Sequence, residues 1–436
     1  MTARLRPQDT VLARNTLWVA LGQVLRVGMQ AVYFILIARA LGSRDYGAYV
    51  GVLAVVAIAA PFASLGSGNL LIKHVAREPH TFARHWGRAL ATTLLTGTIL
   101  LGIVTIVAKL WLPTSVPLQL VLAVGAADLL FVRLVDVSAQ AYQAHQRLSR
   151  TALLQLLLSP LRLLAAIVLI AVTPAPTVLE WGTVYLVSAL IGAGLAVVLV
   201  NRELGRPEFH LRHLASELRE GAFFSVSLSA QSSTNDIDKA MLARLATLEA
   251  TGVYAAAYRL VDVAFVPMAS LLVATYARFF QHGVQGVRAT ARYARRLLGL
   301  GACYGLLAAA VLYFVAPALP AILGDEYHQA VAAVRWLSVL PLLKTVHYFG
   351  ADALTGAGYQ GVRTMILVSI AVVNVLLNVW LIPLYSWRGA AVATVISDGL
   401  LGVAIWASVW YLSRYGHRFE SPDQARSVVQ VGVSAK

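Results

Sequence analysis

Long apolar stretches, each about long enough to cross a lipid bilayer, follow one another along the whole of this sequence. A hydrocarbon core about 30 Å thick requires roughly 20 apolar residues per helical crossing. Lipid offers no partner to backbone polar groups, so every crossing must be a helix. The sequence therefore predicts an all-α polytopic membrane protein with twelve transmembrane helices, at 14–38, 46–70, 88–109, 118–142, 151–172, 181–200, 221–244, 253–277, 297–316, 331–350, 363–383 and 389–412.

The composition narrows the classes of function. Only 13% of the 436 residues are charged and 59% are hydrophobic, whereas about a quarter of the residues in a soluble domain are charged. The loops average about ten residues, which leaves no room for a separate catalytic domain. The sequence has no G-x-x-x-x-G-K-[ST] loop, no His or Cys cluster at metal-ligand spacing, and one cysteine, Cys303. We therefore expect neither an ATP-hydrolysing enzyme nor a metal or other cofactor.

The net charge of +15 is distributed unevenly over the loops. With the N-terminus placed inside, 23 of the 35 lysines and arginines lie in inner segments and only 5 in outer ones. Cationic residues collect in loops that stay in the cytoplasm, so both termini are predicted to be cytoplasmic and the charge does not indicate nucleic acid. The mostly polar segment 225–239 must cross as well, because otherwise the basic loops 201–220 and 278–296 would lie on opposite sides.

Two turns of the sequence resemble each other. The turn after the first predicted helix reads A-R-A-L-G-S-R-D-Y-G-A-Y, and the turn after the seventh reads A-R-L-A-T-L-E-A-T-G-V-Y. Six helices separate the copies, so the halves share one orientation and form a parallel repeat. We expect two pseudo-symmetric six-helix bundles at 1–200 and 221–412, a cytoplasmic linker at 201–220 and a cytoplasmic tail at 413–436. The positions that match, 205 residues apart, are Ala38, Arg39, Gly47 and Tyr49 with Ala243, Arg244, Gly252 and Tyr254.

Polar side chains recur along one face of the first helix in each predicted half. An ionised group at mid-bilayer costs at least roughly 3 kcal/mol, so such residues usually face a cavity inside the protein. Polar packing between helices is the alternative. The residues predicted to line a central water-filled cavity are Asn15, Gln23, Gln30, Ser229, Ser232 and Asp236.

Several cations also lie inside the predicted helices. Arg26 and Arg162 have no acid nearby in the sequence, and unpaired cations in a cavity attract an anion. Guanidinium groups match the geometry of phosphate oxygens. The residues predicted to bind an anionic group are Arg26, Arg133, Arg162, Lys239 and Arg259.

The pentapeptide R-L-V-D-V occurs twice and leaves a second interpretation open for two of these cations. Arg133 can pair with Asp136, and Arg259 with Asp262, across one helical turn. In that interpretation the pairs are structural, because each aspartate neutralises a cation that lies within the membrane. The acids that could instead couple transport to protons or sodium are Asp128, Asp262 and Asp398, with polar packing as the alternative.

Five local motifs, in order along the chain, resemble those of one transporter family. They are R-N-T-L-W from Arg14, A-R-A-L-G-S-R-D-Y-G-A-Y after the first helix, N-D-I-D-K from Asn235 followed by G-V-Y-A-A-A-Y-R-L from Gly252, I-L-G-D-E-Y-H-Q-A before the tenth helix, and N-V-L-L-N-V-W-L-I-P-L-Y-S-W-R-G-A-A from Asn374. With these motifs the chain resembles the polysaccharide-transporter branch of the MOP exporter superfamily, the flippases for O-antigen and related lipid-linked sugars.

This resemblance implies a MATE-like fold of two bundles around a cationic cavity, and alternating access. It implies that a polyprenyl-pyrophosphate-linked oligosaccharide is moved from the inner to the outer leaflet of the bacterial cytoplasmic (inner) membrane, for the synthesis of cell-surface polysaccharide. In the similar lipid II flippases, arginines of helices 1 and 8 contact the pyrophosphate, and the comparable residues here are Arg26 and Arg259. Those relatives have fourteen helices, so the resemblance does not carry over their extra groove for the lipid tail.

The physical chemistry is consistent with this cargo. Moving negative charge outward across an inside-negative membrane gains roughly 2.3 kcal/mol per charge per 100 mV. The membrane potential, or a proton or sodium gradient, is the expected driving force. Other polysaccharide-assembly membrane proteins are expected partners, beside the lipid bilayer and the lipid-linked glycan.

Two other functions compete with the flippase. A cation-coupled multidrug exporter of the same superfamily shares the architecture, but organic cations call for carboxylates in the cavity. A sugar polymerase or ligase would need a substantial external loop, and the longest here, around 317–330, has about a dozen residues.

Overall fold

The computed structural model describes residues 7–209 and 236–415, with side chains described from residue 25 onward. These ranges form helices and turns, without any strand. They cluster into two compact units, each described by itself below. The first comprises Met1–Ala257, Pro317–Ala333 and Asn378–Ala390, and the second comprises Tyr258–Ala316, Val334–Leu377 and Ala391–Lys436. The domain division predicted around 201–220 stays a prediction, since most of that linker lies outside the described residues.

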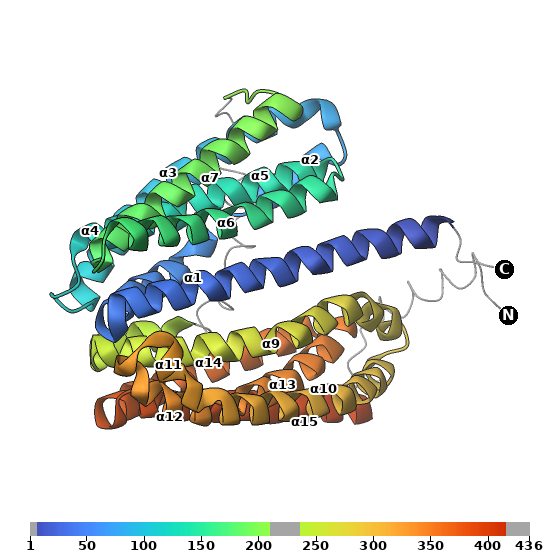
Figure 1. Ribbon diagram of the computed structural model, residues 1–436. Helices are drawn as coiled ribbons and strands as arrows, with labels where there is room; N and C mark the ends of the chain where they lie inside the picture. Colours follow the sequence, from blue (N-terminus) through green and yellow to red (C-terminus); the bar gives the residue numbers. More distant parts are fainter. Residues whose placement is uncertain (1–6, 210–235, 416–436) are drawn as a thin grey trace, which may run out of the picture. The chain divides into compact units, whose positions relative to one another are not determined.

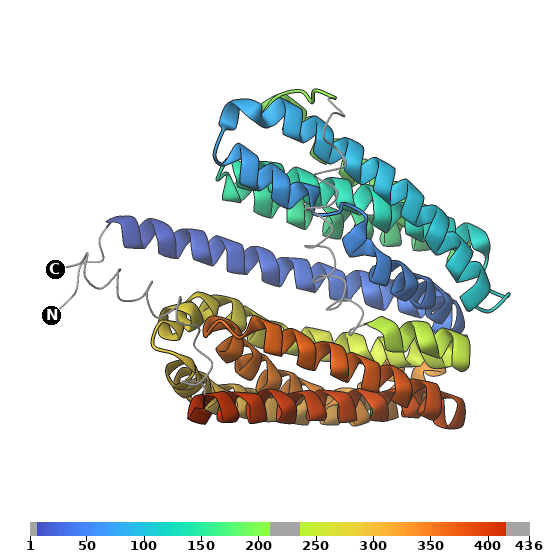
Figure 2. The ribbon, with the colours of Figure 1, turned by 180° about the vertical axis from the view of Figure 1, so that it is seen from behind.

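The first unit contains the helices of the N-terminal half of the chain. Its core joins α3, α5, α6 and α7 through buried side chains that include Trp86, Tyr142, Leu154 and Val200, and Figures 1 and 2 show these helices running alongside one another. Helix α7 begins with a capping box, in which Thr177 and Glu180 satisfy each other's backbone N–H groups. The helices are α1 (Pro7–Ala59), α2 (Ser67–Val75), α3 (Phe82–Trp111), α4 (Leu118–Ala126), the π-helical segment η3 (Ala127–Phe131), α5 (Val132–Ala144), α6 (Leu148–Val172) and α7 (Val178–Glu203).

The second unit is built on close packing between α10 (Val287–Val315) and α13 (Leu340–Gly356). Gly301 and Gly305 of α10 allow this approach, because a Cβ atom on either glycine would collide with side chains or backbone of α13. The core includes Met268, Phe279 and Phe349. The unit also contains most of α9 (Leu248–Gly283), α14 (Gln360–Tyr385) and α15 (Trp387–Tyr415).

Eight helices of the described ranges are long and apolar enough to cross a membrane, or nine if Asp325–Leu337 and Leu340–Gly356 form one bent span. Every predicted span except 221–244 falls on described helices. Predicted span 221–244 lies mostly outside the described residues. The chain is an all-α, multi-pass membrane protein, which confirms the predicted fold class.

Helix α1 contains the first predicted span, 14–38, and the first part of the second, 46–59, on either side of a sharp kink at Gly42 (φ 73°). Glu326, from the short helix η5 (Asp325–Tyr327), accepts a hydrogen bond from the backbone N–H of Ser43 at 2.9 Å, just after this kink. Tyr327 donates to the carbonyl oxygen of Ala38 at 3.0 Å, just before it. A positive φ favours glycine, and the flanking bonds hold both sides of the break in place.

The two turns of the predicted repeat pack against each other within the first unit. A Cβ atom on Gly47 would clash with the carbonyl oxygen of Leu248, and one on Gly252 would clash with the carbonyl oxygen of Ser43. Leu248 follows Ser43 by 205 residues, as Gly252 follows Gly47, so the contact is reciprocal. A reciprocal contact between matching positions is what a two-fold-related pair of elements produces, and it supports the repeat found in the sequence.

Candidate functional site

A largely enclosed charge pair of the first unit joins Asp128 to Arg162. Arg162 Nη2 lies 3.2 Å from Asp128 Oδ1, and the two side chains are 15% and 17% exposed. Tyr185 donates its hydroxyl hydrogen to the same oxygen at 2.8 Å, and the guanidinium lies 4.3 Å from the centre of the Tyr185 ring. Arg162 was expected to lack an acidic partner, and that expectation is wrong because Asp128 approaches from another helix.

Aromatic side chains surround this pair. Trp181 stacks with Tyr33 at 6.5 Å between ring centroids, and both Trp181 and Tyr185 make edge contacts with Tyr49. Asp128 lies on the π-helical segment η3, a geometry that often marks functional sites. A direct ion pair with additional hydrogen bonds is the arrangement in which a buried carboxylate and guanidinium tolerate each other.

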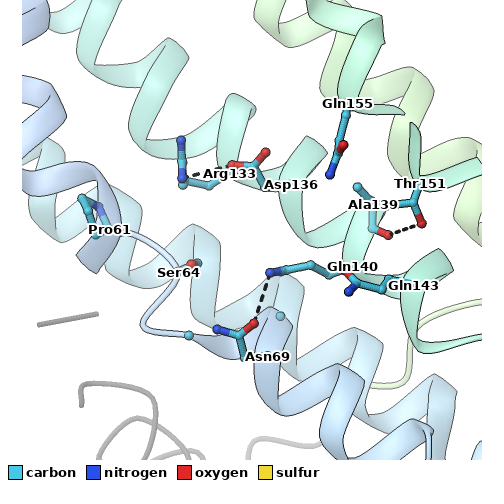
Figure 3. A pocket seen from close by; sticks show the side chains of 12 residues that line it. Pro61, Ser64, Asn69, Arg133, Asp136, Ala139, Gln140, Gln143, Thr151 and Gln155 are labelled. Carbon is cyan, nitrogen blue, oxygen red and sulfur yellow. Dashed lines mark hydrogen bonds and ion pairs between the residues drawn. The ribbon is translucent and has the colours of Figure 1, made fainter. Parts of the chain in front are cut away.

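A second pair, Arg133 with Asp136, lines a pocket of about 220 Å³ within the first unit (Figure 3). The two charged groups are 3.0 Å apart across one turn of α5. The side chains are 28% and 47% exposed, so the pair is accessible. The intrahelical pairing left open by the R-L-V-D-V motif is therefore what the structure shows for Arg133. The pocket is lined by Pro61, Ser64, Gly66, Gly68, Asn69, Arg133, Asp136, Ala139, Gln140, Gln143, Thr151 and Gln155.

Lys239, on the helix at 236–245, is the third of the predicted anion-binding cations that has an acidic partner in the first unit. Its Nζ lies 2.8 Å from Asp236 and 3.9 Å from Asp238, and Lys239 is 9% exposed. Tyr254 donates its hydroxyl hydrogen to Asp238. Asp236, predicted to line a cavity, is thus an ion-pair partner of Lys239.

Two of the remaining candidates of the first unit, Arg26 and Gln30, have described side chains on α1. Arg26 is half buried, and its Nε is enclosed without a hydrogen-bond partner among the described residues. Gln30, one turn further along, is also half buried. The side chains of Asn15 and Gln23, and residues Ser229 and Ser232, lie outside the described part of the structure.

The second unit contains Arg259, Asp262 and Asp398, all half buried. Lys344 of α13 lies close to Asp262 in this unit. Lys344 donates to the Tyr258 hydroxyl at 2.9 Å and lies 3.9 Å from the carboxylate of Asp262. Its ammonium group also lies 4.7 Å from the centre of the Tyr258 ring, a cation–π contact.

A comparison of the sequence with models of protein families identifies the family of this chain. The model of the polysaccharide biosynthesis protein family matches residues 12–282, more than half of the chain. This chain belongs to that family. The matched residues, 12–282, contain the five predicted cations as well as Asp128 and Asp262. Lys344 and Asp398 lie outside this range. No curated protein matches the chain in sequence.

Solved structures of the MOP superfamily share the fold of this polysaccharide biosynthesis protein. An inward-facing multidrug resistance MATE family transporter is 14% identical, with a TM-score of 0.74 over 88% of this chain and 96% of that one. The lipid II flippase MurJ in an inward closed conformation is 9% identical, with a TM-score of 0.74 over 90% of this chain and 87% of that one. The MATE multidrug transporter DinF-BH is 15% identical, with a TM-score of 0.64 over 95% and 98%. At these identities the similarity shows the MOP fold.

The sequence analysis of this family member missed two groups of residues. One is the aromatic cluster of Tyr33, Tyr49, Trp181 and Tyr185. The other is the set of amides that line the pocket, among which Gln140 and Gln143 are three residues apart. Amides inside or beside apolar spans were a usable signal, because a polar group at membrane depth needs a partner or a cavity. Tyrosines in such spans are less informative, since they also anchor at membrane interfaces.

Proposed function

We propose that this polysaccharide biosynthesis protein is a flippase of the bacterial cytoplasmic membrane that moves a polyprenyl-pyrophosphate-linked oligosaccharide from the inner to the outer leaflet by alternating access. The observation that carries the proposal is the family match over 12–282, a region that contains a series of charged side chains within apolar helices. The MOP fold supports it, because one of the solved structures with this fold is a lipid II flippase. The orientation with both termini in the cytoplasm is part of the proposal.

The chemistry of the cargo requires a polar route. Sugar hydroxyls and a pyrophosphate cannot enter hydrocarbon, so the headgroup must pass through the protein while the polyprenyl tail stays in lipid. Ionised residues inside membrane helices are the usual sign of such a route. The polar groups of α1, α5, α6 and the helix at 236–245 supply it in this proposal.

Arg26 is the strongest candidate for direct contact with the pyrophosphate. Its Nε has no partner among the described residues, and the guanidinium fork matches phosphate oxygens. Arg133, Arg162 and Lys239 each have a carboxylate within 3.2 Å, so a phosphate would have to replace that carboxylate. Arg259 stays a candidate on the resemblance to lipid II flippases. Transfer is driven by the membrane potential or by a proton or sodium gradient acting on Asp128, Asp262 or Asp398.

A cation-coupled multidrug exporter is the second candidate, because two of the solved structures with this fold are multidrug transporters of the MATE type. Organic cations are bound by carboxylates and aromatic faces. In the first unit the carboxylates of Asp128, Asp136 and Asp236 are each paired with a cation, so none of these three is free to bind an organic cation.

Translocation in proteoliposomes tests the proposal. The cargo is a fluorescent polyprenyl-pyrophosphate-linked disaccharide, and the readout is its accessibility to an impermeant quencher on the opposite leaflet. Arg26→Ala should lower the rate at least about tenfold, because a charge-assisted hydrogen bond contributes roughly 1.5–3 kcal/mol. Arg292→Ala is the matched control, since Arg292 is an exposed arginine of α10, and it should transport normally. Transport of a cationic dye but not of the lipid would establish the exporter instead.

A further inference from the structure

The pocket beside Arg133 has a lining chemistry that the pyrophosphate does not explain. Four carboxamide side chains surround it, together with the hydroxyls of Ser64 and Thr151. Its only ionised groups among the described residues are Arg133 and Asp136, which neutralise each other at 3.0 Å. The pocket is therefore polar and close to electrically neutral. The carboxamides belong to Asn69, Gln140, Gln143 and Gln155.

Neutrality argues against a doubly charged ligand in this pocket. A pyrophosphate next to Arg133 would also face the carboxylate of Asp136, and like charges at short range repel strongly where water is scarce. A carboxamide has two N–H donors and an acceptor oxygen, while a hydroxyl is donor and acceptor at once. A wall of amides with one paired arginine and aspartate therefore complements a ligand rich in hydroxyl groups.

Irregular backbone forms one side of the pocket. Between α1 and α2 the chain passes through the short helix η1 (Ala60–Phe62), which contains Pro61, and then through Leu65 and Gly66 at φ values of 40° and 64°. Broken helices at membrane depth are tolerated where they line a cavity, and such breaks often form binding sites in transporters. A left-handed leucine is a strained conformation, which the surrounding structure holds beside the pocket.

Gly68 lets Gln140 lie across the first turn of α2. A Cβ atom at Gly68 would collide with the Gln140 side-chain oxygen, and the Gln140 amide reaches Asn69 at 3.5 Å, the limit of a hydrogen bond. Figure 3 shows these two side chains approaching each other from α5 and α2. The close fit fixes the position of Gln140 in the wall.

Two of the amides are available to a ligand. Within the described ranges, the side chains of Gln143 and Gln155 make no hydrogen bond to protein, and both are exposed. Gln155 extends from α6 into the view of the pocket, on the far side from Asn69 (Figure 3). Polar groups at such a site are normally paired with water or with a ligand. The volume of about 220 Å³ corresponds to about seven waters of liquid, which is room for one sugar ring.

We infer that this pocket is a subsite for a neutral sugar residue of the cargo, which assigns Arg133 to the sugar and leaves the pyrophosphate to Arg26 and the other candidate cations. The inference rests on the proposed function, because it assigns one part of the lipid-linked glycan to one part of the first unit. In the predicted orientation, Asn69, Gln140 and Gln143 lie toward the cytoplasmic ends of their helices. The sugar of an incoming lipid would then meet the pocket before translocation.

The test compares two cargo lipids in proteoliposomes of the full-length protein. One is a polyprenyl pyrophosphate without sugar, and the other carries a single N-acetylglucosamine. The double variant Gln140→Met/Gln155→Met keeps the length of both side chains and removes both amides. It should slow the sugar-bearing lipid about tenfold, from the loss of two hydrogen bonds, and leave the sugar-free lipid unchanged. Gln281→Met is the control, because Gln281 is an exposed glutamine of α9.

Two outcomes of this comparison would overturn the subsite. Equal slowing of both lipids would assign the pocket to the pyrophosphate, and unchanged rates for both would remove it from the transport route. Each variant is first checked for wild-type elution and thermal unfolding in detergent, and Gln143→Met replaces Gln140→Met in the double variant if the original pair does not fold.

A binding measurement keeps the subsite testable if the wild-type protein translocates neither lipid, a result that would count against the proposed function alone. Saturation-transfer NMR on the protein in nanodiscs uses the methyl glycosides of N-acetylglucosamine, glucose and galactose as probes. A signal from at least one of them that disappears in Gln140→Met/Gln155→Met supports the subsite. No signal from any, or a signal unaffected by the variant, contradicts it.

Discussion

Each unit of the molecule contains a cluster of one acid, one cation and one tyrosine, and the two clusters are connected differently. In the first unit Arg162 contacts Asp128 directly at 3.2 Å, and Tyr185 donates to the same carboxylate oxygen. In the second unit Lys344 donates to the Tyr258 hydroxyl at 2.9 Å, with the acid Asp262 further away at 3.9 Å.

The difference follows from the shape and surroundings of the cations. A guanidinium can pair with a carboxylate and at the same time stack on an aromatic ring. An ammonium is a compact point charge with three donors. Asp128 is 17% exposed and relies on its neighbours, while Asp262 is 45% exposed and can be hydrated. The acid and cation of the first cluster are therefore held together more closely than those of the second.

Removing the acid of the first cluster should have the largest effect. Asp128→Ala leaves Arg162 enclosed without its carboxylate, and breaking a buried ion pair from one side costs about 3–5 kcal/mol. We expect a loss of this size in the free energy of unfolding, measured by denaturant titration in mixed micelles.

The double variant Asp128→Leu/Arg162→Met provides the control for that prediction. It removes both charges, so it should recover most of the lost stability, because an apolar pair of similar volume is often as stable as a buried ion pair. If Asp128→Ala is no less stable than the wild type, Asp128 and Arg162 do not stabilise each other. The two clusters would then not differ in how closely their charges are held.

Arg162→Lys should have an intermediate effect. The charge is kept, but the shorter ammonium loses the stacking over Tyr185, at present 4.3 Å from the guanidinium carbon to the ring centre. Cation–π contacts contribute about 0.5–2 kcal/mol, and we expect a stability loss in this range by the same titration. Arg388→Lys serves as the comparison, since Arg388 lies beside Trp387 at a longer 5.4 Å and should change less. Full stability of Arg162→Lys would show that the ring contact contributes nothing.

Much of the fold could be predicted from the sequence because the bilayer imposes a simple rule. Apolar runs such as 151–172 and 363–383 fall within single helices, α6 and α14. The sharp kink at Gly42 and the π-helical segment at Ala127–Phe131 could not be predicted. They depend on contacts with residues distant in the sequence, such as the bond from Ser43 to Glu326, 283 residues away.

The candidate site was predictable only where its partners are close in the sequence. Arg133 and Asp136 are three residues apart on one helix, and the motif indicated their pairing. Arg162 and Asp128 are 34 residues apart, and Lys344 lies 86 residues from Tyr258. Periodicity within one helix carries no information about which neighbouring helix supplies a partner.

Lys344→Met should destabilise the protein less than the changes in the first cluster. Asp262 is 45% exposed, so water can replace part of what the ammonium supplied, and partly exposed pairs contribute about 0–1 kcal/mol. We expect a change in the free energy of unfolding below about 1 kcal/mol. A loss as large as that of Asp128→Ala would mean that the second cluster is as fixed as the first, which would remove the distinction between them.

Tyr258→Phe should give the smallest effect and resolves which part of the tyrosine holds Lys344. The variant removes the hydroxyl that accepts from Nζ at 2.9 Å but keeps the ring 4.7 Å from it. One neutral-acceptor hydrogen bond contributes about 0.5–1.5 kcal/mol, and because the cation–π contact remains we expect a loss near the lower limit. Tyr411→Phe, at an exposed tyrosine of α15, sets the baseline. If Tyr258→Phe lowers the free energy of unfolding more than Lys344→Met does, the hydroxyl must stabilise a group other than Lys344. The tyrosine would then not belong to a cluster centred on Lys344.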